Sequence, residues 1–94
     1  MAGLFRVLTT PAFEREFRAI SKKDSTLVRA LEELIETLGN DPHNRSGRHK
    51  IKKLAGLKAG DGQWRVRWRD HRLRYDIFGR EVVLHSFRHR KDAY

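Results

Sequence analysis

The chain has 94 residues, no cysteine and a formal net charge of +9. This length corresponds to one domain, so we treat residues 1–94 as a single unit. The lack of cysteine excludes a disulfide-stapled scaffold, a thiolate zinc site and a cysteine-nucleophile enzyme. No apolar run approaches the roughly 18–20 residues of a membrane span, and no signal-peptide pattern opens the chain. We therefore expect a small soluble, cytoplasmic protein with no membrane association.

Positive charge is concentrated in the second half of the chain. Residues 1–47 contain seven Lys/Arg and seven Asp/Glu, whereas residues 48–94 contain fourteen and five. Clustering of this kind indicates a polyanionic partner, of which nucleic acid is the first candidate. The alternative is charge that only maintains solubility, but solubility does not require clustering.

The first half predicts a strand followed by a helix. Residues 4–9 (LFRVLT) are typical of a short strand. Thr10 is suited to cap a helix in which Pro11 is the first residue. Phe13, Phe17 and Ile20 then form one apolar stripe at helical spacing.

A second helix follows, capped by Asp24 or Ser25. Gly39 stands where a glycine commonly follows the last helical residue. The apolar stripe of this helix consists of Leu27, Leu31, Leu34, Ile35 and Leu38. The two stripes predict a helical hairpin that buries one face.

Residues 40–63 show no regular pattern and are rich in Gly, Asn, Lys and His. We expect a loop here that touches the core through Ile51, Leu54 and Leu57. A loop of this length in a compact domain usually has a function.

From Trp64 onward, apolar residues alternate with arginines, which predicts three antiparallel strands joined by turns at residues 70–71 and 78–80. The face expected to pack on the helices consists of Trp64, Val66, Trp68, Leu73, Tyr75, Ile77, Val82 and Leu84. The fold class is therefore α+β, with an N-terminal strand, a helical hairpin and a three-stranded meander in one sheet.

The opposite face of this meander is rich in arginine. With two-residue turns and strict alternation, the predicted cross-strand pairs are Arg69–Arg72, Arg67–Arg74, Arg65–Asp76, Arg74–His85 and Arg72–Phe87. Like charges directly opposite each other are unfavourable, whereas arginine binds phosphate bidentately. We therefore expect a phosphate-binding face on which Phe87 stacks against a base. The alternative is a solvated face with stacked arginines.

The C-terminal segment follows the last predicted strand, so we expect it beside the same face. His89, Arg90 and Tyr94 offer an imidazole, a guanidinium and a phenol, groups that suffice for RNA cleavage without a metal ion. A tyrosine acts as a base only where nearby cations favour its phenolate. The alternatives are a surface histidine and a terminal tyrosine that packs on the domain. Histidines and carboxylates at metal-ligand spacing are lacking, so we expect neither a metal nor another cofactor.

The order of these parts resembles the RelE/ParE toxin superfamily of toxin–antitoxin modules, over nearly the whole chain. The segments that carry the resemblance are residues 51–57 (IKKLAGL), 64–69 (WRVRWR), 72–76 (RLRYD) and 89–94 (HRKDAY). The last of these is similar to the RelE branch, whose members cut messenger RNA in the ribosomal A site, without a metal, through the 2′-hydroxyl.

The resemblance implies a catalytic role for each matching residue. Arg65, Arg67 and Arg72 would hold the scissile phosphate, Arg90 would assist the leaving group, and Tyr94 would be the base. Arginine cannot act as a base, so His89 would share proton transfer. We further expect nucleic-acid contacts from Lys50, Lys52, Lys53, Arg69, Arg74, His85, Phe87, Arg88 and Lys91.

Two other functions remain open at this point. One is a ParE-like toxin that inhibits DNA gyrase by binding, and the other is a non-catalytic module that binds RNA or the ribosome. For a toxin, the resemblance implies an acidic, partly disordered antitoxin similar to RelB, which folds as it wraps the basic surface.

Overall fold

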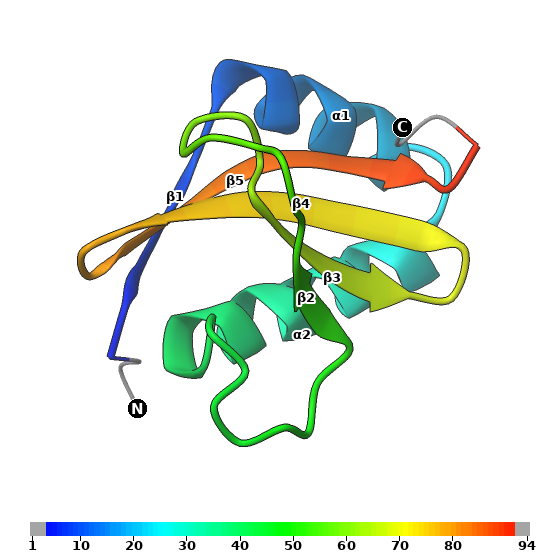
Figure 1. The fold of residues 1–94 in the computed structure, drawn as a ribbon. Helices are drawn as coiled ribbons and strands as arrows, with labels where there is room; N and C mark the ends of the chain where they lie inside the picture. The colour runs from blue at the N-terminus through cyan, green and yellow to red at the C-terminus, as the bar shows by residue number, and fades with distance from the viewer. Residues whose placement is uncertain (1–3, 92–94) are drawn as a thin grey trace.

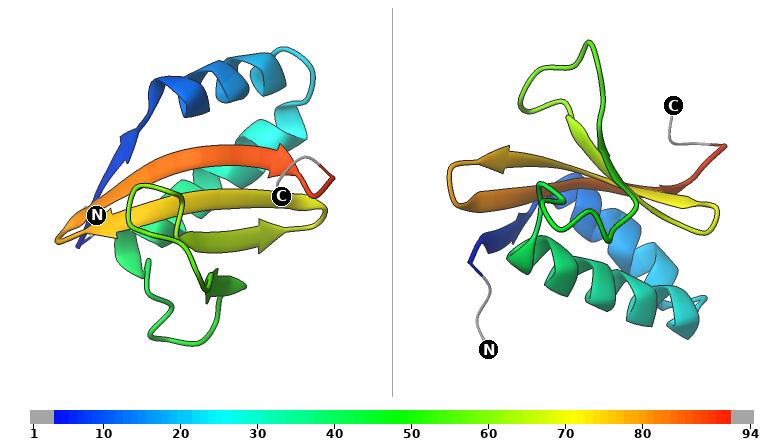
Figure 2. Two further views of the ribbon diagram at one scale, coloured as in Figure 1. Left: turned by 45° about the horizontal axis from the view of Figure 1, so that its top comes forward. Right: turned by 60° about the horizontal axis from the view of Figure 1, so that its bottom comes forward.

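The computed structural model describes residues 4–91 and places two helices on one face of a mixed sheet (Figures 1 and 2). In chain order the elements are β1 (Arg6–Thr9), α1 (Pro11–Ser21), α2 (Ser25–Asn40), β2 (Ile51–Lys53), β3 (Trp64–Trp68), β4 (His71–Phe78) and β5 (Glu81–His89). Neither helix in this part of the chain is long and apolar enough to cross a bilayer.

The strands lie in the order β1-β5-β4-β3-β2. β1 runs parallel to β5, and every other neighbouring pair is antiparallel. The predicted α+β class, with a helical hairpin packed on one sheet, is confirmed. The sheet therefore has one face covered by helices and one outer face.

Both helix starts follow the predicted capping chemistry. The Thr10 hydroxyl accepts a hydrogen bond from the Phe13 amide at 3.1 Å, and Pro11 is the first helical residue. At α2 the Asp24 carboxylate accepts from the amides of Thr26 and Leu27, so Asp24 is the cap.

The sequence predicts Gly39 just after the second helix, but Gly39 lies inside α2. The helix continues to Asn40, and the Gly39 carbonyl accepts a hydrogen bond from the Phe5 amide at 2.9 Å. A Cβ at this position would lie 3.7 Å from the Val7 side chain. The glycine thus allows the start of the chain to approach the helix closely, which a single sequence does not distinguish from a helix stop.

The segment predicted as a plain loop contains the edge strand β2. Ile51 lies opposite Val66 of β3 and packs against the core. Three residues are too few for an alternating pattern to be recognised. The chain after β2, residues 54–63, then crosses the outer face of the sheet, on the side away from the helices (Figure 2).

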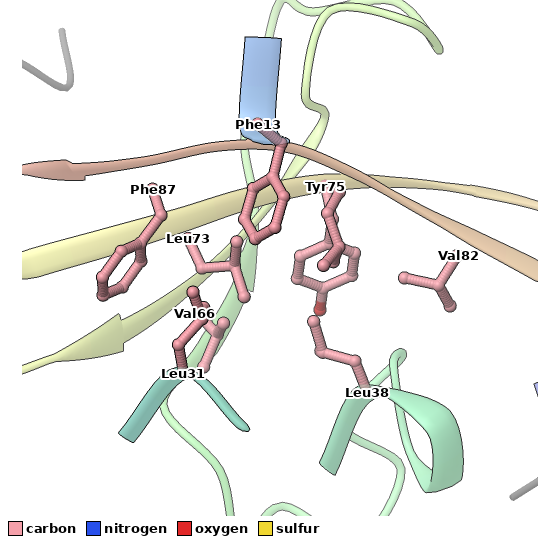
Figure 3. Close-up of a cluster of buried hydrophobic side chains, with 9 residues drawn as sticks. Phe13, Leu31, Leu38, Val66, Leu73, Tyr75, Val82 and Phe87 are labelled. Atoms are coloured by element: carbon pink, nitrogen blue, oxygen red, sulfur yellow. The ribbon is translucent and has the colours of Figure 1, made fainter. Parts of the chain in front are cut away.

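The core lies between the helices and the sheet (Figure 3). Tyr75 is fully buried, and its hydroxyl donates to the Pro42 carbonyl at 2.6 Å. Burial raises the pKa of the Tyr75 phenol well above its ordinary value. Trp68, predicted to be a core residue, lies outside the buried cluster, which consists of Phe13, Leu31, Leu38, Val66, Leu73, Tyr75, Val82, Leu84 and Phe87.

The first turn of the meander differs from the prediction by one residue. The turn is formed by Arg69 and Asp70, and Trp68 lies opposite His71. Arg69 adopts a positive φ of 51°, as a tight turn between twisted strands requires. The facing arginine pairs are therefore Arg67–Arg72 and Arg65–Arg74, not Arg69–Arg72 and Arg67–Arg74.

A β-bulge changes the second strand pair. Tyr75 lies opposite Leu84 but Arg74 lies opposite Ser86, so His85 is an extra residue in β5. The strict alternation assumed from the sequence fails at this point. As a result Phe87 turns to the helix side, where it is 2% exposed.

Candidate nucleic-acid interface

The open part of the outer face carries four cationic residues on three neighbouring strands. Arg67 of β3 lies directly opposite Arg72 of β4. In the adjoining row, Arg65 lies between Lys52 of β2 and Arg74 of β4. We call Lys52, Arg65, Arg67 and Arg72 the arginine surface. Lys52 and Arg67 are exposed, and the other two are half-buried.

The Arg67–Arg72 pair is not neutralised within residues 4–91, where neither side chain forms an ion pair. Arg72 Nη1 donates to the carbonyls of Arg69 and His71, both at 3.2 Å. These bonds orient the guanidinium but leave its charge uncompensated. Because two like charges in register oppose folding, the arrangement favours a bound anion.

Arg74 and His85, which we expected to bind nucleic acid, lie beneath the loop of residues 54–63. Arg74 donates through Nε to the Gly62 carbonyl at 3.0 Å and through Nη2 to the Asp61 carbonyl at 2.8 Å. Gly62 has a φ of +76°, and a Cβ there would come within 3.1 Å of the His85 ring. Arg74 therefore holds the loop in place, and the His85 ring lies close to Gly62.

Asp76 fixes the same loop from below. Its carboxylate is 2% exposed and accepts hydrogen bonds from the amides of Gly62 and Gln63, at 3.0 and 2.9 Å. The sequence pattern predicts Asp76 opposite Arg65, with no role in the site. The only feature of the sequence that could have indicated this role is the presence of one acidic residue on a face rich in arginine.

Arg88 of β5 lies opposite Arg72, in the same row as Arg67, but unlike those two arginines it is paired with a carboxylate. Arg88 Nε forms an ion pair with Glu16 of α1, whose other carboxylate oxygen accepts the Phe87 amide at 3.0 Å. Glu16 thus covers the part of β5 that extends beyond β1. The expectation that Phe87 stacks on a base is wrong, because its ring is in the core.

The remaining predicted contacts are distributed around the arginine surface. Arg69 lies in the turn with its guanidinium 4.9 Å from the centre of the Trp68 ring. Lys53 Nζ lies 5.7 Å from the centre of the Trp64 ring. Lys50 and Lys91 are exposed, and the Lys50 carbonyl accepts the Arg67 amide at 3.0 Å.

His89 lies on the helix side of the sheet, not beside the arginine surface as expected. It is opposite His71, with ring centres 5.4 Å apart, and His71 stacks on Phe87 at 5.2 Å. Burial, reinforced by His89, lowers the pKa of His71 below its usual value. The bulge at His85 explains this placement, since it shifts every later residue of β5 to the other face.

Arg90 follows the strand and is tied to the first turn. Its amide donates to the Asp70 carbonyl at 2.6 Å, and its Nε lies 3.8 Å from the Asp70 carboxylate. Tyr94 lies outside the described residues. The structure therefore brings together Arg65, Arg67 and Arg72, but not His89. Residues 4–91 hold no group of three side chains placed to bind a metal ion.

Comparison with known proteins agrees with this architecture. The fold is similar to that of the RelB–RelE antitoxin–toxin complex from Methanococcus jannaschii, with 18% identity, a TM-score of 0.70 and coverage of 93% of this chain and 94% of that chain. It is similar to the YoeB dimer from Staphylococcus aureus, with 21% identity, a TM-score of 0.68 and coverage of 89% and 94%. It is also similar to the toxin–antitoxin complex RelBE2 from Mycobacterium tuberculosis, with 22% identity, a TM-score of 0.68 and coverage of 90% of this chain and 96% of that chain.

No curated protein sequence matched the chain. Residues 7–94, however, match the family model described as the ParE toxin of the type II toxin–antitoxin system parDE. This match begins at the second residue of β1 and includes the arginine surface. The chain therefore belongs to the ParE toxin family of type II toxin–antitoxin systems, within the RelE/ParE superfamily.

Proposed function

We propose that this toxin is an endoribonuclease that cuts messenger RNA in the ribosomal A site without a metal ion. The observation that supports this most is the facing pair Arg67 and Arg72, which has no ion-pair partner within residues 4–91. Guanidinium groups fixed in advance stabilise the charge that develops on a phosphate as it is attacked.

In this proposal the 2′-hydroxyl oxygen attacks the adjacent phosphorus and the bond to the 5′-oxygen breaks. The products are a 2′,3′-cyclic phosphate and a 5′-hydroxyl. Arg65, Arg67 and Arg72 hold the phosphate, and Arg90 neutralises the charge on the leaving 5′-oxygen, which takes its proton from water. Tyr94 takes the proton of the 2′-hydroxyl as a phenolate, a form that positively charged neighbours would favour. His89 is the competing base, disfavoured by its contact with His71 on the helix side.

The test is cleavage of a defined mRNA, with and without programmed ribosomes, in the presence of EDTA. We expect Arg72→Ala to slow ribosome-dependent cutting by about 100-fold or more. Arg29→Ala is the matched control, because Arg29 is an exposed arginine of α2 on the opposite side of the sheet. Tyr94→Phe and His89→Gln, assayed in parallel, identify the base. No cutting by the wild type, or equal losses for Arg72→Ala and Arg29→Ala, would contradict the proposal.

The family match favours a second candidate, a ParE-like toxin that inhibits DNA gyrase by binding. A supercoiling assay distinguishes the two functions. Inhibition of gyrase by a protein that cuts no mRNA on the ribosome would favour the second candidate over the first.

We also propose an acidic antitoxin that covers the arginine surface. Support comes from the net charge of +9 and from the similar fold of RelE in its complex with the antitoxin RelB. Co-expression with the neighbouring short reading frame should give a complex that weakens as salt concentration rises.

A further inference from the structure

An apolar hollow lies on the outer face, beside the arginine surface. Its volume is about 300 Å³, and its walls are Leu54, Ala55 and Leu57 of the loop together with Arg74 of β4. Leu54 and Leu57 are only half-buried, and neither belongs to the core cluster. These loop residues therefore present apolar surface on a face that is otherwise cationic.

The hollow is preformed, because hydrogen bonds close the loop that lines it. The Leu54 amide donates to the Gln63 carbonyl at 2.8 Å, and the Gln63 side-chain amide donates to the Leu57 carbonyl at 3.0 Å. Asp76 and Arg74 fasten the far end of the loop to the sheet. A ligand would meet a fixed shape, and a fixed shape reduces the entropy lost on binding.

Arg74 gives the hollow one flat, cationic wall. Its Nε and Nη2 both donate to carbonyls of the loop, which fixes the plane of the guanidinium. A fixed guanidinium plane is suited to stack on a flat ring. The leucines supply the apolar contacts that a base ring also needs.

The charges around the hollow indicate what the ring is attached to. Arg74 lies opposite Arg65, which in turn lies opposite Lys52. Side chains directly opposite on neighbouring strands are about 5 Å apart, so a phosphate on this row lies within one nucleotide of the hollow. We propose that the hollow is a base-binding subsite that receives one unstacked nucleobase of single-stranded RNA. This inference rests on the proposed RNA-cutting function and adds a site to it.

The test compares two octamers by fluorescence anisotropy at about 50 mM salt, where phosphate contacts are strong. One is 2′-O-methyl RNA, which cannot react through its 2′-oxygen, and the other is a chain of tetrahydrofuran phosphate spacers, with the same phosphates and no bases. We expect Leu57→Ala to weaken binding of the RNA about 5–10-fold and binding of the spacer chain less than about 2-fold. Leu4→Ala, at an exposed leucine outside the hollow, should change neither.

A second variant of the hollow keeps the test valid if Leu57→Ala fails to fold. Ala55 is exposed, so Ala55→Trp fills the hollow without removing a core contact, and it should show the same selective loss. Arg67→Ala should weaken both octamers, since it removes a phosphate contact.

Equal losses on both octamers, or no loss in either variant of the hollow, would overturn the base-binding subsite and leave RNA binding standing. If the wild type binds neither octamer, both the base-binding subsite and the proposed RNA binding are wrong. If Leu57→Ala weakens only an acidic antitoxin peptide, the hollow binds a protein side chain, and the inference is wrong.

Discussion

The outer face of the sheet has two halves built from one sequence pattern. In one half, the exposed Arg67 of β3 faces the half-buried Arg72 of β4. In the other, Arg74, Asp76 and the bulge residue His85 lie beneath the loop of residues 54–63. Figure 1 shows this loop crossing in front of β4 and β5. The alternation of arginine with apolar residues is the same in both halves.

The difference between the halves comes from one carboxylate and one extra residue. Asp76 binds two loop amides, and the bulge at His85 creates a register shift beneath the loop. The Arg74 guanidinium in the covered half therefore has backbone carbonyls as partners, whereas Arg67 and Arg72 form no ion pair within residues 4–91. Only the open half is suited to bind a phosphate.

The largest expected change in the free energy of unfolding is that of a variant at Phe87, which tests the bulge at His85. Phe87→Ala should lower the free energy of unfolding by about 3–5 kcal/mol, because the ring is buried against the helices. Phe78→Ala is the matched control, since Phe78 is 45% exposed, and it should cost less than about 1 kcal/mol. Urea unfolding measures both. Similar losses for the two variants would mean that Phe87 lies on the outer face after all.

The second prediction concerns the carboxylate that holds the covered half. Asp76→Ala should lower the free energy of unfolding by about 2–4 kcal/mol, because two loop amides lose a charged acceptor. Asp61→Ala serves as the control, since the exposed Asp61 carboxylate accepts a single bond, from the Lys58 amide at 3.1 Å. Hydrogen exchange at Gly62 and Gln63 should accelerate in Asp76→Ala. Unchanged protection there would show that the loop is held by other contacts.

The sequence predicted the parts of the fold that depend on local chemistry. The cap at Thr10, the cap at Asp24 or Ser25, the apolar stripes and the period of two from Trp64 all depend on neighbours within a few residues. The superfamily was also recognisable, through residues 51–57 and the arginine pattern. The pairing of Arg67 with Arg72, by contrast, depends on the exact position of a turn, which the sequence placed one residue too late.

The position of Phe87 and the role of Asp76 could not be predicted, because each depends on a contact between distant residues. The bulge at His85 accompanies a loop that arrives from residues 54–63, and nothing local marks it. Of the expected site, Arg65, Arg67 and Arg72 were correctly placed on one face, whereas His89 was placed on the wrong face for the same reason as Phe87. The catalytic roles remain predictions.

The third prediction separates stability from function in the open half. Arg67→Thr should raise the free energy of unfolding by about 0.2–1 kcal/mol, because it removes a like-charge neighbour of Arg72. Arg6→Thr on β1 is the control. Because Arg6 lies opposite Glu81, its replacement should not raise the free energy of unfolding. RNA binding should weaken in Arg67→Thr alone. A variant less stable than the wild type would mean that the arginine pair supports the fold.

The smallest expected effect is a pH dependence at His71, at the open end of the sheet. The pKa of His71 is lowered from 6.5 mainly by burial and then by His89, while Asp70 and Asp24 act in the opposite direction. The unfolded chain therefore binds a proton more readily than the folded chain, so this contribution to stability is complete above pH 6.5 and decreases as the pH falls through 6.5 towards the lower folded value. Urea unfolding at about pH 7.5 and about pH 5 should show a smaller loss on acidification for His71→Gln than for the wild type. If both proteins lose the same stability, or the wild type gains some, then burial does not lower the pKa of His71 in the folded chain.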